Sequence, residues 1–110
     1  MDRVTQYRQV LQQIVLQHSR YQPSEGEIEV IPIIDKRQDQ YQVIHVGWAG
    51  RKRIYNTLHL SLRDSKVRIH NDPTEEGIAS ELLSHGIPES DIVLDYQAPY
   101  LRQYTSFGKG

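Results

Sequence analysis

Acidic and imidazole side chains gather in the stretch HNDPTEEGIASELLSHGIPESDIVLDY, which begins at His70. Asp72, Glu75 and Glu76 lie close together there, and His85 follows on their C-terminal side. Carboxylates and imidazoles of this kind could bind a metal ion or act as general acids and bases. The same residue types also mark the ends of helices, so the cluster has two competing interpretations.

The helical interpretation accounts for nearly every residue of this cluster. Asp72 is a good N-cap, Pro73 suits the first helical position, and Glu75 completes a capping box. Apolar residues follow at helical spacing, and Gly86 is a typical C′ residue. Such a cap stabilises a helix by about 1 kcal/mol, which justifies the acids without a catalytic role. We therefore predict a helix over residues 73–85 with structural residues at both ends.

A pair of histidines could begin a metal site. A two-residue turn at Asp64–Ser65 collects the apolar side chains of the two flanking strands on one face. The same register sets His59 directly opposite His70 on the other face. Catalytic zinc normally takes three protein ligands, and the third candidate, His45, reaches that face in only one of two possible registers. An exposed cross-strand pair is therefore favoured, and no metal or cofactor is expected.

A basic run stands beside a tryptophan at the tip of a predicted hairpin. Arg51, Lys52 and Arg53 follow Trp48, so cations and an indole ring could hold a phosphate and stack on a base. Charged hairpin tips also keep edge strands from aggregating, and a solvated turn is the favoured interpretation. Direct DNA binding through this hairpin is the alternative. Three nearby cations could assist it: Arg63, Lys66 and Arg68.

Motifs that would indicate an enzyme are lacking. The sequence has no glycine-rich phosphate loop, nucleophile elbow or metal-binding helix motif. General acid–base catalysis needs paired groups in a pocket, and the carboxylates here are explained by the helix cap or lie in a loop with Asp35 and Asp39. We predict a protein without catalytic residues. A metal-dependent hydrolase that uses His59 and His70 is the least favoured reading.

The elements that position these residues follow from hydrophobic periodicity. A helix is predicted over residues 2–21, and a later extended segment has the sequence ESDIVLDY. Four strands are predicted between the two helices, over residues 27–34, 41–48, 51–64 and 66–72. The expected fold is α+β, with a four-stranded antiparallel meander and both helices on one face. One domain spans residues 1–110, and its tail, about 97–110, packs on the body.

Composition narrows the class of protein further. The chain has 110 residues, no cysteine and a formal charge of −1. Disulfides and thiolate zinc sites are therefore excluded, and no overall basic field attracts nucleic acid. No apolar stretch approaches the roughly 20 residues that cross a bilayer, and the N-terminus lacks the apolar core of a signal peptide. We expect a cytoplasmic protein that makes no membrane contact.

Several short motifs together resemble the XisI-type family of fdxN-element excision controlling factors from cyanobacteria. They are WAGRKR from Trp48, LHLSLRDSKVRI, DPTEEGIA from Asp72, GIP from Gly86, DIVL, and a closing Pro99, Arg102, Thr105 and Phe107. Many relatives carry Gly where Pro73 stands, a change that a helix start tolerates. The resemblance implies an accessory protein that acts with a nuclease-like companion, XisH, while a separate recombinase removes the DNA element. It supplies no catalytic residues.

The predicted function is therefore regulatory and depends on protein–protein contact. A sheet with helices on one side leaves its other face free to meet a partner. Tyr55 or its register neighbours, His59, Arg68 and His70 would lie on that face, a mixture of aromatic and basic groups that suits an interface. A symmetric homodimer is expected. The proposed partner or nucleic-acid surface comprises Trp48, Arg51, Lys52, Arg53, His59, Arg68 and His70.

Overall fold

The computed structural model describes residues 2–21, 26–102 and 105–108. Its helices and strands are α1 (Arg3–Ser19), β1 (Glu27–Asp35), β2 (Gln40–Ala49), β3 (Lys52–Arg63), β4 (Lys66–Asn71), α2 (Ile78–Ser84), the 3₁₀ turn η1 (Glu89–Asp91), β5 (Ile92–Leu94) and α3 (Pro99–Arg102). The first four strands begin and end close to their predicted positions. Among the described residues, no helix is long and apolar enough to cross a membrane.

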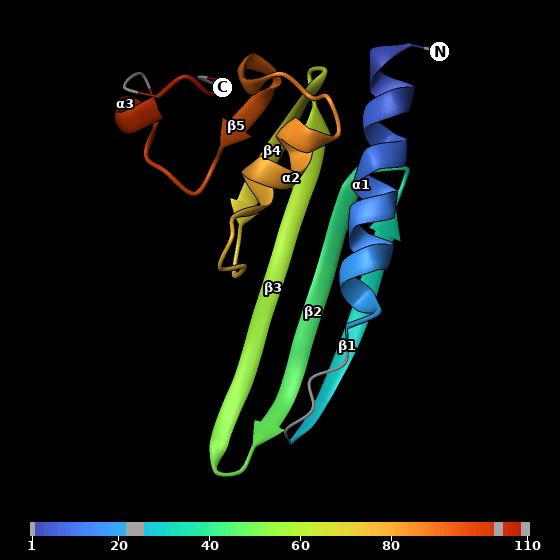
Figure 1. Ribbon diagram of the computed structural model, residues 1–110, viewed down its shortest axis with the longest axis vertical. Helices are drawn as coiled ribbons and strands as arrows, with labels where there is room; N and C mark the ends of the chain where they lie inside the picture. The colour runs from blue at the N-terminus through green and yellow to red at the C-terminus, as the bar shows by residue number, and fades with distance from the viewer. Residues whose placement is uncertain (1, 22–25, 103–104, 109–110) are drawn as a thin grey trace.

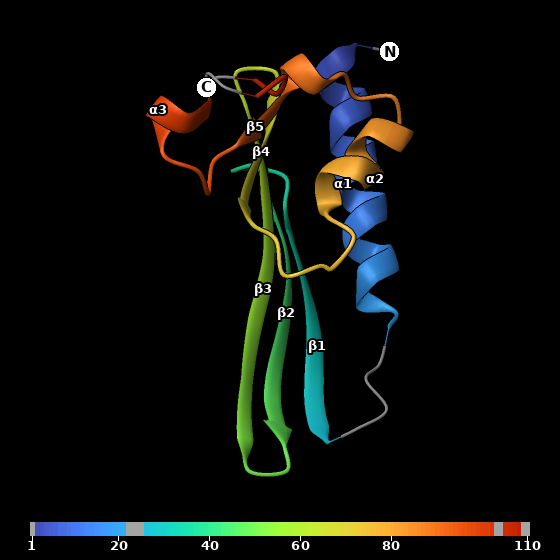
Figure 2. The same ribbon diagram turned by 60° about the vertical axis from the view of Figure 1, so that its left-hand side comes forward.

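One sheet contains all of the described strands, in the order β1-β2-β3-β4-β5. The first four strands form the predicted antiparallel meander. The prediction of four strands was incomplete, because β5 adds a fifth that runs parallel to β4. A parallel neighbour needs a crossover connection, and the segment that contains α2 supplies it. The fold is therefore α+β with a mixed sheet, and the crossover holds α2 against the same face as α1 (Figure 2).

Helix α1 covers the sheet with an apolar stripe. Tyr7, Leu11, Ile14 and Val15 recur at helical spacing and are buried. They join buried side chains of β2, β3, β4, β5 and α2 in one core. Full burial of a leucine or isoleucine side chain contributes about 1.5–3 kcal/mol, so this stripe is sufficient to hold α1 on the sheet.

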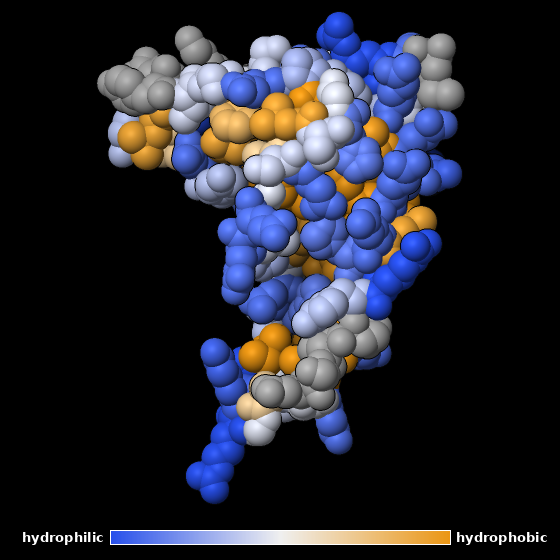
Figure 3. Space-filling model, in the orientation of Figure 1, coloured by the Kyte–Doolittle hydropathy of each residue, from blue (hydrophilic) through white to orange (hydrophobic). Residues whose placement is uncertain are grey.

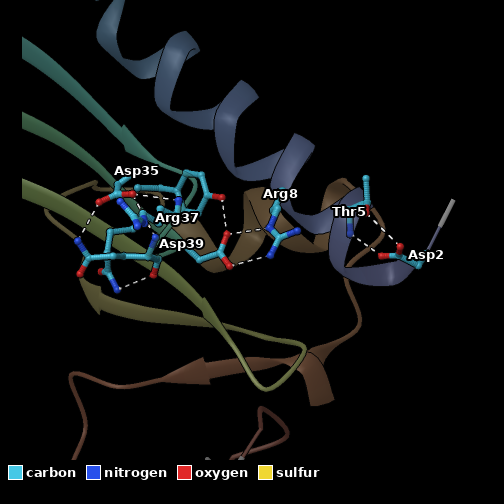
Figure 4. A network of polar contacts seen from close by, with 9 residues as sticks. Asp2, Thr5, Arg8, Asp35, Arg37 and Asp39 are labelled. Atoms are coloured by element: carbon cyan, nitrogen blue, oxygen red, sulfur yellow. Dashed lines mark hydrogen bonds and ion pairs between the residues drawn. The ribbon is translucent and has the colours of Figure 1, made fainter.

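Polar contacts fix the N-terminal half of α1 (Figure 4). The carboxylate of Asp2 caps the helix and accepts the backbone N–H of Thr5 at 2.8 Å. Arg8 donates from Nε and Nη2 to the two oxygens of Asp39, at 2.8 and 3.0 Å. Tyr41 donates its hydroxyl to the same carboxylate at 2.9 Å. The Arg8 guanidinium holds the pKa of Asp39 below its usual value, so this clamp between α1 and the β1–β2 turn stays charged.

Two tight turns set the registers of the central strands. Asp64 and Ser65 both have positive φ, and Leu60 pairs with Ile69 as predicted. The β2–β3 turn lies at Gly50–Arg51, one residue beyond the predicted Ala49–Gly50, because Ala49 pairs with Lys52. Gly50 has φ 64°, which suits the first central position of a type II′ turn.

Helix α2 begins later than predicted. It starts at Ile78, because Gly77 has φ 85° and ψ 126°, a conformation that no helix contains. Asp72 is not the N-cap, and Pro73 and Glu75 precede the helix. The Asp72 carboxylate nevertheless accepts the N–H of Ile78 at 2.8 Å across the intervening loop, so the acid still meets the helix start.

The C-terminal end of α2 has a regular stop. His85 is the C-cap, and Gly86 follows with φ 89°. Gly86 donates its N–H to the Leu83 carbonyl at 3.0 Å, and Ile87 donates to the Leu82 carbonyl at 3.2 Å. These two bonds form a Schellman motif, which needs a residue with positive φ at the position of Gly86.

Strands β1, β2 and β3 continue beyond the helices as a long arm that ends at the β2–β3 turn (Figure 1). Helix α3 lies near the other end of the molecule, on the opposite side of the sheet from α1 and α2 (Figure 2). The segment near the C-terminus is tied to β5, since Gly108 donates its N–H to the Ile92 carbonyl at 2.7 Å. The arm therefore carries a sheet surface that none of the three helices covers.

Candidate functional site

The uncovered surface of β1, β2 and β3 is the candidate functional site, and we name it the open face. Neighbouring strand residues point to opposite sides, so buried Val43, Leu58 and Leu60 assign the alternate side chains to the open face. The residues of the open face are Glu27, Glu29, Ile31, Ile33, Gln42, Ile44, Val46, Trp48, Arg53, Tyr55, Thr57 and His59.

The centre of the open face is apolar. Ile44 on β2 pairs with Ile31 on β1, and Val46 pairs with Tyr55 on β3. Trp48 lies next along β2, towards the tip of the arm. The exposed fraction is 50% for Trp48 and 65% for Tyr55. Exposed aromatic and partly exposed aliphatic side chains in consecutive rows of one sheet form a contiguous patch, which is typical of protein–protein interaction sites.

Charged groups flank this patch on opposite edges. Glu27 and Glu29 lie on β1, and Arg53 lies on β3. The row nearest the tip reads Glu27, Trp48, Arg53 across the three strands. The guanidinium carbon of Arg53 stands 5.6 Å from the centroid of the Trp48 ring, which is within the range of a cation–π contact.

The basic run of Arg51, Lys52 and Arg53 is divided between the two sides of the arm. Arg51 occupies the turn, Lys52 shares the helix-facing side with Leu58, and Arg53 lies on the open face. All three side chains belong to exposed residues. Figure 3 shows hydrophilic side chains at the end of the arm, seen from the helix side. The cations thus surround the tip, and only Arg53 stands beside the exposed tryptophan.

The two predicted histidines meet, but not as directly opposed residues. A β-bulge after His59 pairs it with Asn71, so His70 is the extra residue on β4. The two rings still lie side by side, with centroids 4.5 Å apart. Burial and the neighbouring His70 together lower the pKa of His59, so the pair favours the neutral form of that ring.

The ring nitrogens of this pair are engaged by other residues. His59 Nε2 lies 2.7 Å from the side-chain oxygen of Gln40. His70 Nδ1 lies 2.9 Å from the Asp95 carboxylate, and its Nε2 lies 2.7 Å from the Ser61 hydroxyl. A neutral imidazole that donates from Nδ1 to the carboxylate can accept from the hydroxyl at Nε2. Both rings therefore serve a polar network between strands.

A metal site at this pair lacks its third ligand. The observed β2–β3 register pairs His45 with Asn56, on the helix-facing side of the sheet. His45 therefore lies on the side opposite His59 and His70. In the part of the chain that the structure describes, no group of three His, Asp or Glu side chains could hold a metal ion.

Asp95 is the hub of a cluster that sequence reasoning missed. Besides His70, it contacts Arg102 Nη2 at 3.0 Å and Arg68 Nη1 at 3.4 Å. Arg102 also donates from Nε to the Gln97 carbonyl at 3.1 Å. These contacts bring β4 together with the segment after β5. Arg68, predicted to face a partner, instead has a mostly buried side chain in this cluster. No local pattern signals the hub, because its members are distant in sequence.

Ser61, His70 and Asp95 have the connectivity of a serine-protease triad. The surroundings argue against catalysis. Ser61 is only 3% exposed and lies inside β3. The N–H of Leu62, the usual oxyanion donor after a nucleophile, is bonded to the Asp39 carbonyl at 3.1 Å. The trio links β3, β4 and the segment after β5.

The acids that precede α2 line a hollow with a volume of about 500 Å³. Glu75 and Glu76 contribute to its wall together with Glu81, whose carboxylate lies 2.8 Å from His18 Nε2. Glu75 and Glu76 are exposed, and Asp72 is engaged with backbone N–H groups. The carboxylates do not converge on one point, which agrees with a structural role.

Known proteins resemble this chain over nearly its whole length. The family model described as XisI protein matches residues 1–109. The fdxN element excision controlling factor XisI from Anabaena variabilis has a solved structure that is 32% identical, with a TM-score of 0.82 and coverage of 99% of this chain and 100% of its own. A XisI-like protein from the same organism is 35% identical, with a TM-score of 0.87 and coverage of 96% and 97%. No curated protein matches.

Proposed function

Because this chain belongs to the XisI protein family, we propose that it is a regulatory factor in the excision of a DNA element. One solved relative is named an fdxN element excision controlling factor. The factor acts without catalytic residues of its own, through contact with other proteins. The cytoplasm, where the DNA and the recombinase are found, is its place of action.

The observation that supports this proposal is the open face. It presents the exposed aromatic side chains of Trp48 and Tyr55. The aliphatic residues Ile31, Ile44 and Val46 lie beside them on the same face. Interfaces are enriched in such aromatic residues and in arginine, which Arg53 supplies. The single triad-like arrangement of the described residues has its hydroxyl buried at Ser61. An exposed aromatic surface fits a regulator better than an enzyme.

The proposed companion is a XisH-type protein with a nuclease-like fold. In this scheme any DNA strand cleavage belongs to the companion or to the recombinase, and this chain controls when they act. The two proteins are expected to associate when they are produced together. In a stable complex the companion would supply the contact with DNA. This chain, whose overall charge is −1, would then need no strong DNA affinity of its own.

Co-purification tests the proposed function. The tagged full chain is co-expressed with the untagged companion, and the companion is measured after affinity capture and gel filtration. We expect it to co-elute in a fixed ratio. An excision reporter with the recombinase should lose excision when this chain is omitted. Soluble companion that never co-elutes, together with unchanged excision, would overturn the proposal.

The tip of the arm favours DNA binding as a second candidate function. Arg51, Lys52 and Arg53 are exposed there, with Trp48 beside the last of them. Phosphate contacts predict a loss of affinity with salt of about 0.9 log unit per log unit for each neutralised phosphate. Gel-shift titrations at several salt concentrations measure this slope. The triple substitution to alanine should flatten it, whereas no binding of the unchanged protein at low salt would eliminate this candidate.

A further inference from the structure

We propose that the open face is the contact surface between two copies of this chain, stacked face to face around a two-fold axis parallel to β2. This deepens the proposed function, because it names the first partner of the open face. It does not depend on the companion protein. The companion would then meet a dimer, with both arm tips at the same end of the assembly.

The two sides of β1, β2 and β3 differ in what packs against them, and the open face lacks a covering layer. Helices α1 and α2 lie on one side of β1, β2 and β3, and α3 lies on the other side near the opposite end from the tip (Figure 2). Ile31, Ile44 and Val46 are each only partly buried. A second sheet packs against such a surface at about 10 Å, with the strands of the two layers within about 30° of each other.

The strand order leaves two simple ways to stack two copies. With a two-fold axis along β2, β1 of one copy lies over β3 of the other, and β2 lies over its own copy. With an axis across the strands, β1 lies over β1 and β3 over β3. The two arrangements bury similar side chains, so the charges at the edges decide between them.

Charge complementarity selects the axis along β2. Glu27 and Arg53 occupy the same row on opposite sides of Trp48. An axis along β2 brings the Glu27 of each copy over the Arg53 of the other, and Glu29 over the Tyr55 hydroxyl. An axis across the strands, through the centre of the patch, instead brings Glu27 over Ile33 and Glu29 over Ile31 of the other copy. An acid that is buried against apolar side chains loses water without gaining a cation, whereas opposite charges steer the partners into register.

The apolar rows agree with the same axis. Ile44 and Val46 on β2 then meet their own copies at the centre, where an isologous interface is driest. Ile31 on β1 meets the partner's Thr57 on β3. The polar cluster around Asp95 lies outside this overlap, beyond β3, where the chain covers itself. Each copy therefore contributes one continuous patch, acidic on one edge and basic on the other.

The first experiment measures self-association of the purified full chain without a companion. Sedimentation equilibrium from about 1 to 100 µM is expected to give twice the 12.8 kDa mass of the chain. Tyr55→Glu should weaken dimerisation by about tenfold or more. Tyr100→Glu is the matched control, since Tyr100 is 68% exposed on α3 and Tyr55 is 65% exposed. Monomer throughout this range, or equal weakening by both substitutions, would overturn the proposal.

Charge reversal then tests the orientation. Glu27→Arg alone and Arg53→Glu alone should each weaken the dimer by about threefold to tenfold. The double variant should recover most of the loss, because each new cation faces a new acid across the interface. With the axis across the strands, the double variant would not recover. Glu27 and Arg53 are both exposed, so folding is preserved, and circular dichroism checks this.

Cross-linking provides a geometric test, since the natural chain contains no cysteine. Gln42 and Val46 lie about 13 Å apart along β2. With the axis along β2, Gln42→Cys and Val46→Cys each place two thiols opposite one another, and a short bis-maleimide should join both variants. An axis across the strands can bring only one of these positions onto its own copy. Tyr100→Cys is the negative control.

The two proposals can fail separately. A monomer that still captures the companion would overturn the dimer and retain the regulatory role. A dimer that captures no companion and leaves excision unchanged would overturn the regulatory role and retain the dimer.

Discussion

The two faces of the β1–β3 sheet differ greatly, although the same strands build both. Val43 and Leu60 on the helix side are fully buried, whereas Tyr55 and Trp48 on the open face are half exposed or more. Apolar side chains recur at alternate positions along the strands on both faces. The difference teaches that apolar patterning alone does not say which face is the core, because a helix must dock before a face is buried.

The side of the sheet that carries the open face differs between the tip of the arm and the region near β4. Near β4, the side chains of Ser61, His70 and Asp95 are linked by hydrogen bonds, and Arg102 after β5 donates to the same Asp95 carboxylate. Near the tip, Val46 and Trp48 belong to no such network. The hydrogen-bonding groups near β4 therefore find partners within the chain, whereas the apolar open face is left for another molecule.

Truncation of a core residue should show the largest effect and separate the two faces. Leu60→Ala is expected to reduce the free energy of unfolding by about 2–5 kcal/mol, because Leu60 is fully buried in the core. Tyr55→Ala should change the stability of the monomer by less than about 1 kcal/mol. Urea unfolding at low protein concentration measures both. Similar losses would mean that the open face is part of the core.

Removal of the Asp95 charge should have the next largest effect. Asp95→Asn leaves Arg68 and Arg102, whose side chains are 13% and 11% exposed, without their carboxylate. We expect a loss of about 3 kcal/mol in urea unfolding. Asp64→Asn is the control, because Asn accepts the positive φ of that exposed turn position. An equally small loss in the free energy of unfolding for both variants would show that Asp95 does not hold the C-terminal segment.

Ser61→Ala should have a smaller effect on stability and none on function. It removes the hydrogen bond to His70, which is expected to cost about 1 kcal/mol. Excision in the reporter assay should be unchanged, because the hydroxyl has a structural role. A catalytic serine would instead lose activity by about 10³-fold or more. Abolished excision by a folded Ser61→Ala protein would show that Ser61, His70 and Asp95 form an active site.

The smallest expected effect is a pH dependence of stability. Burial and His70 lower the pKa of His59 below its ordinary 6.5, so the unfolded chain binds the proton more readily than the folded chain. The stability that the folded chain gains from a neutral His59 is fully present above pH 6.5, and it is lost as the pH falls below that value. Burial similarly lowers the pKa of His45.

His59→Gln should reduce this slope, and the contribution of His45 should remain. Urea midpoints between about pH 5 and 7.5 measure the difference. A slope that is unchanged by His59→Gln would place the titration elsewhere.

Local patterns predicted the elements that depend on neighbouring residues. The turn at Asp64–Ser65 and the pairing of Leu60 with Ile69 followed from alternation and turn chemistry. The start of α2 was wrong because the sequence offers a plausible cap at Asp72, while the backbone of Gly77 prevents a helix before Ile78. Backbone conformation at a single glycine is not encoded by residue type alone.

Long-range pairings were the part that local patterns could not predict. The bulge that displaces His70 depends on how β4 meets the rest of the sheet. The contacts of Asp95 join β4 to the chain after β5, and His70 and Asp95 lie far apart in sequence. The parallel partner of β5 was missed for the same reason, since three residues carry no signal of their neighbour.

By itself, the sequence determined the alternating strands, the amphipathic first helix and the absence of cysteine chemistry, because each is a property of adjacent or regularly spaced residues. Only the tertiary structure decided which face of the sheet α1 and α2 cover, and hence which apolar side chains remain accessible. The physical reason is that a strand presents two faces of similar composition, and the free energy that distinguishes them comes from helices packed against one of them.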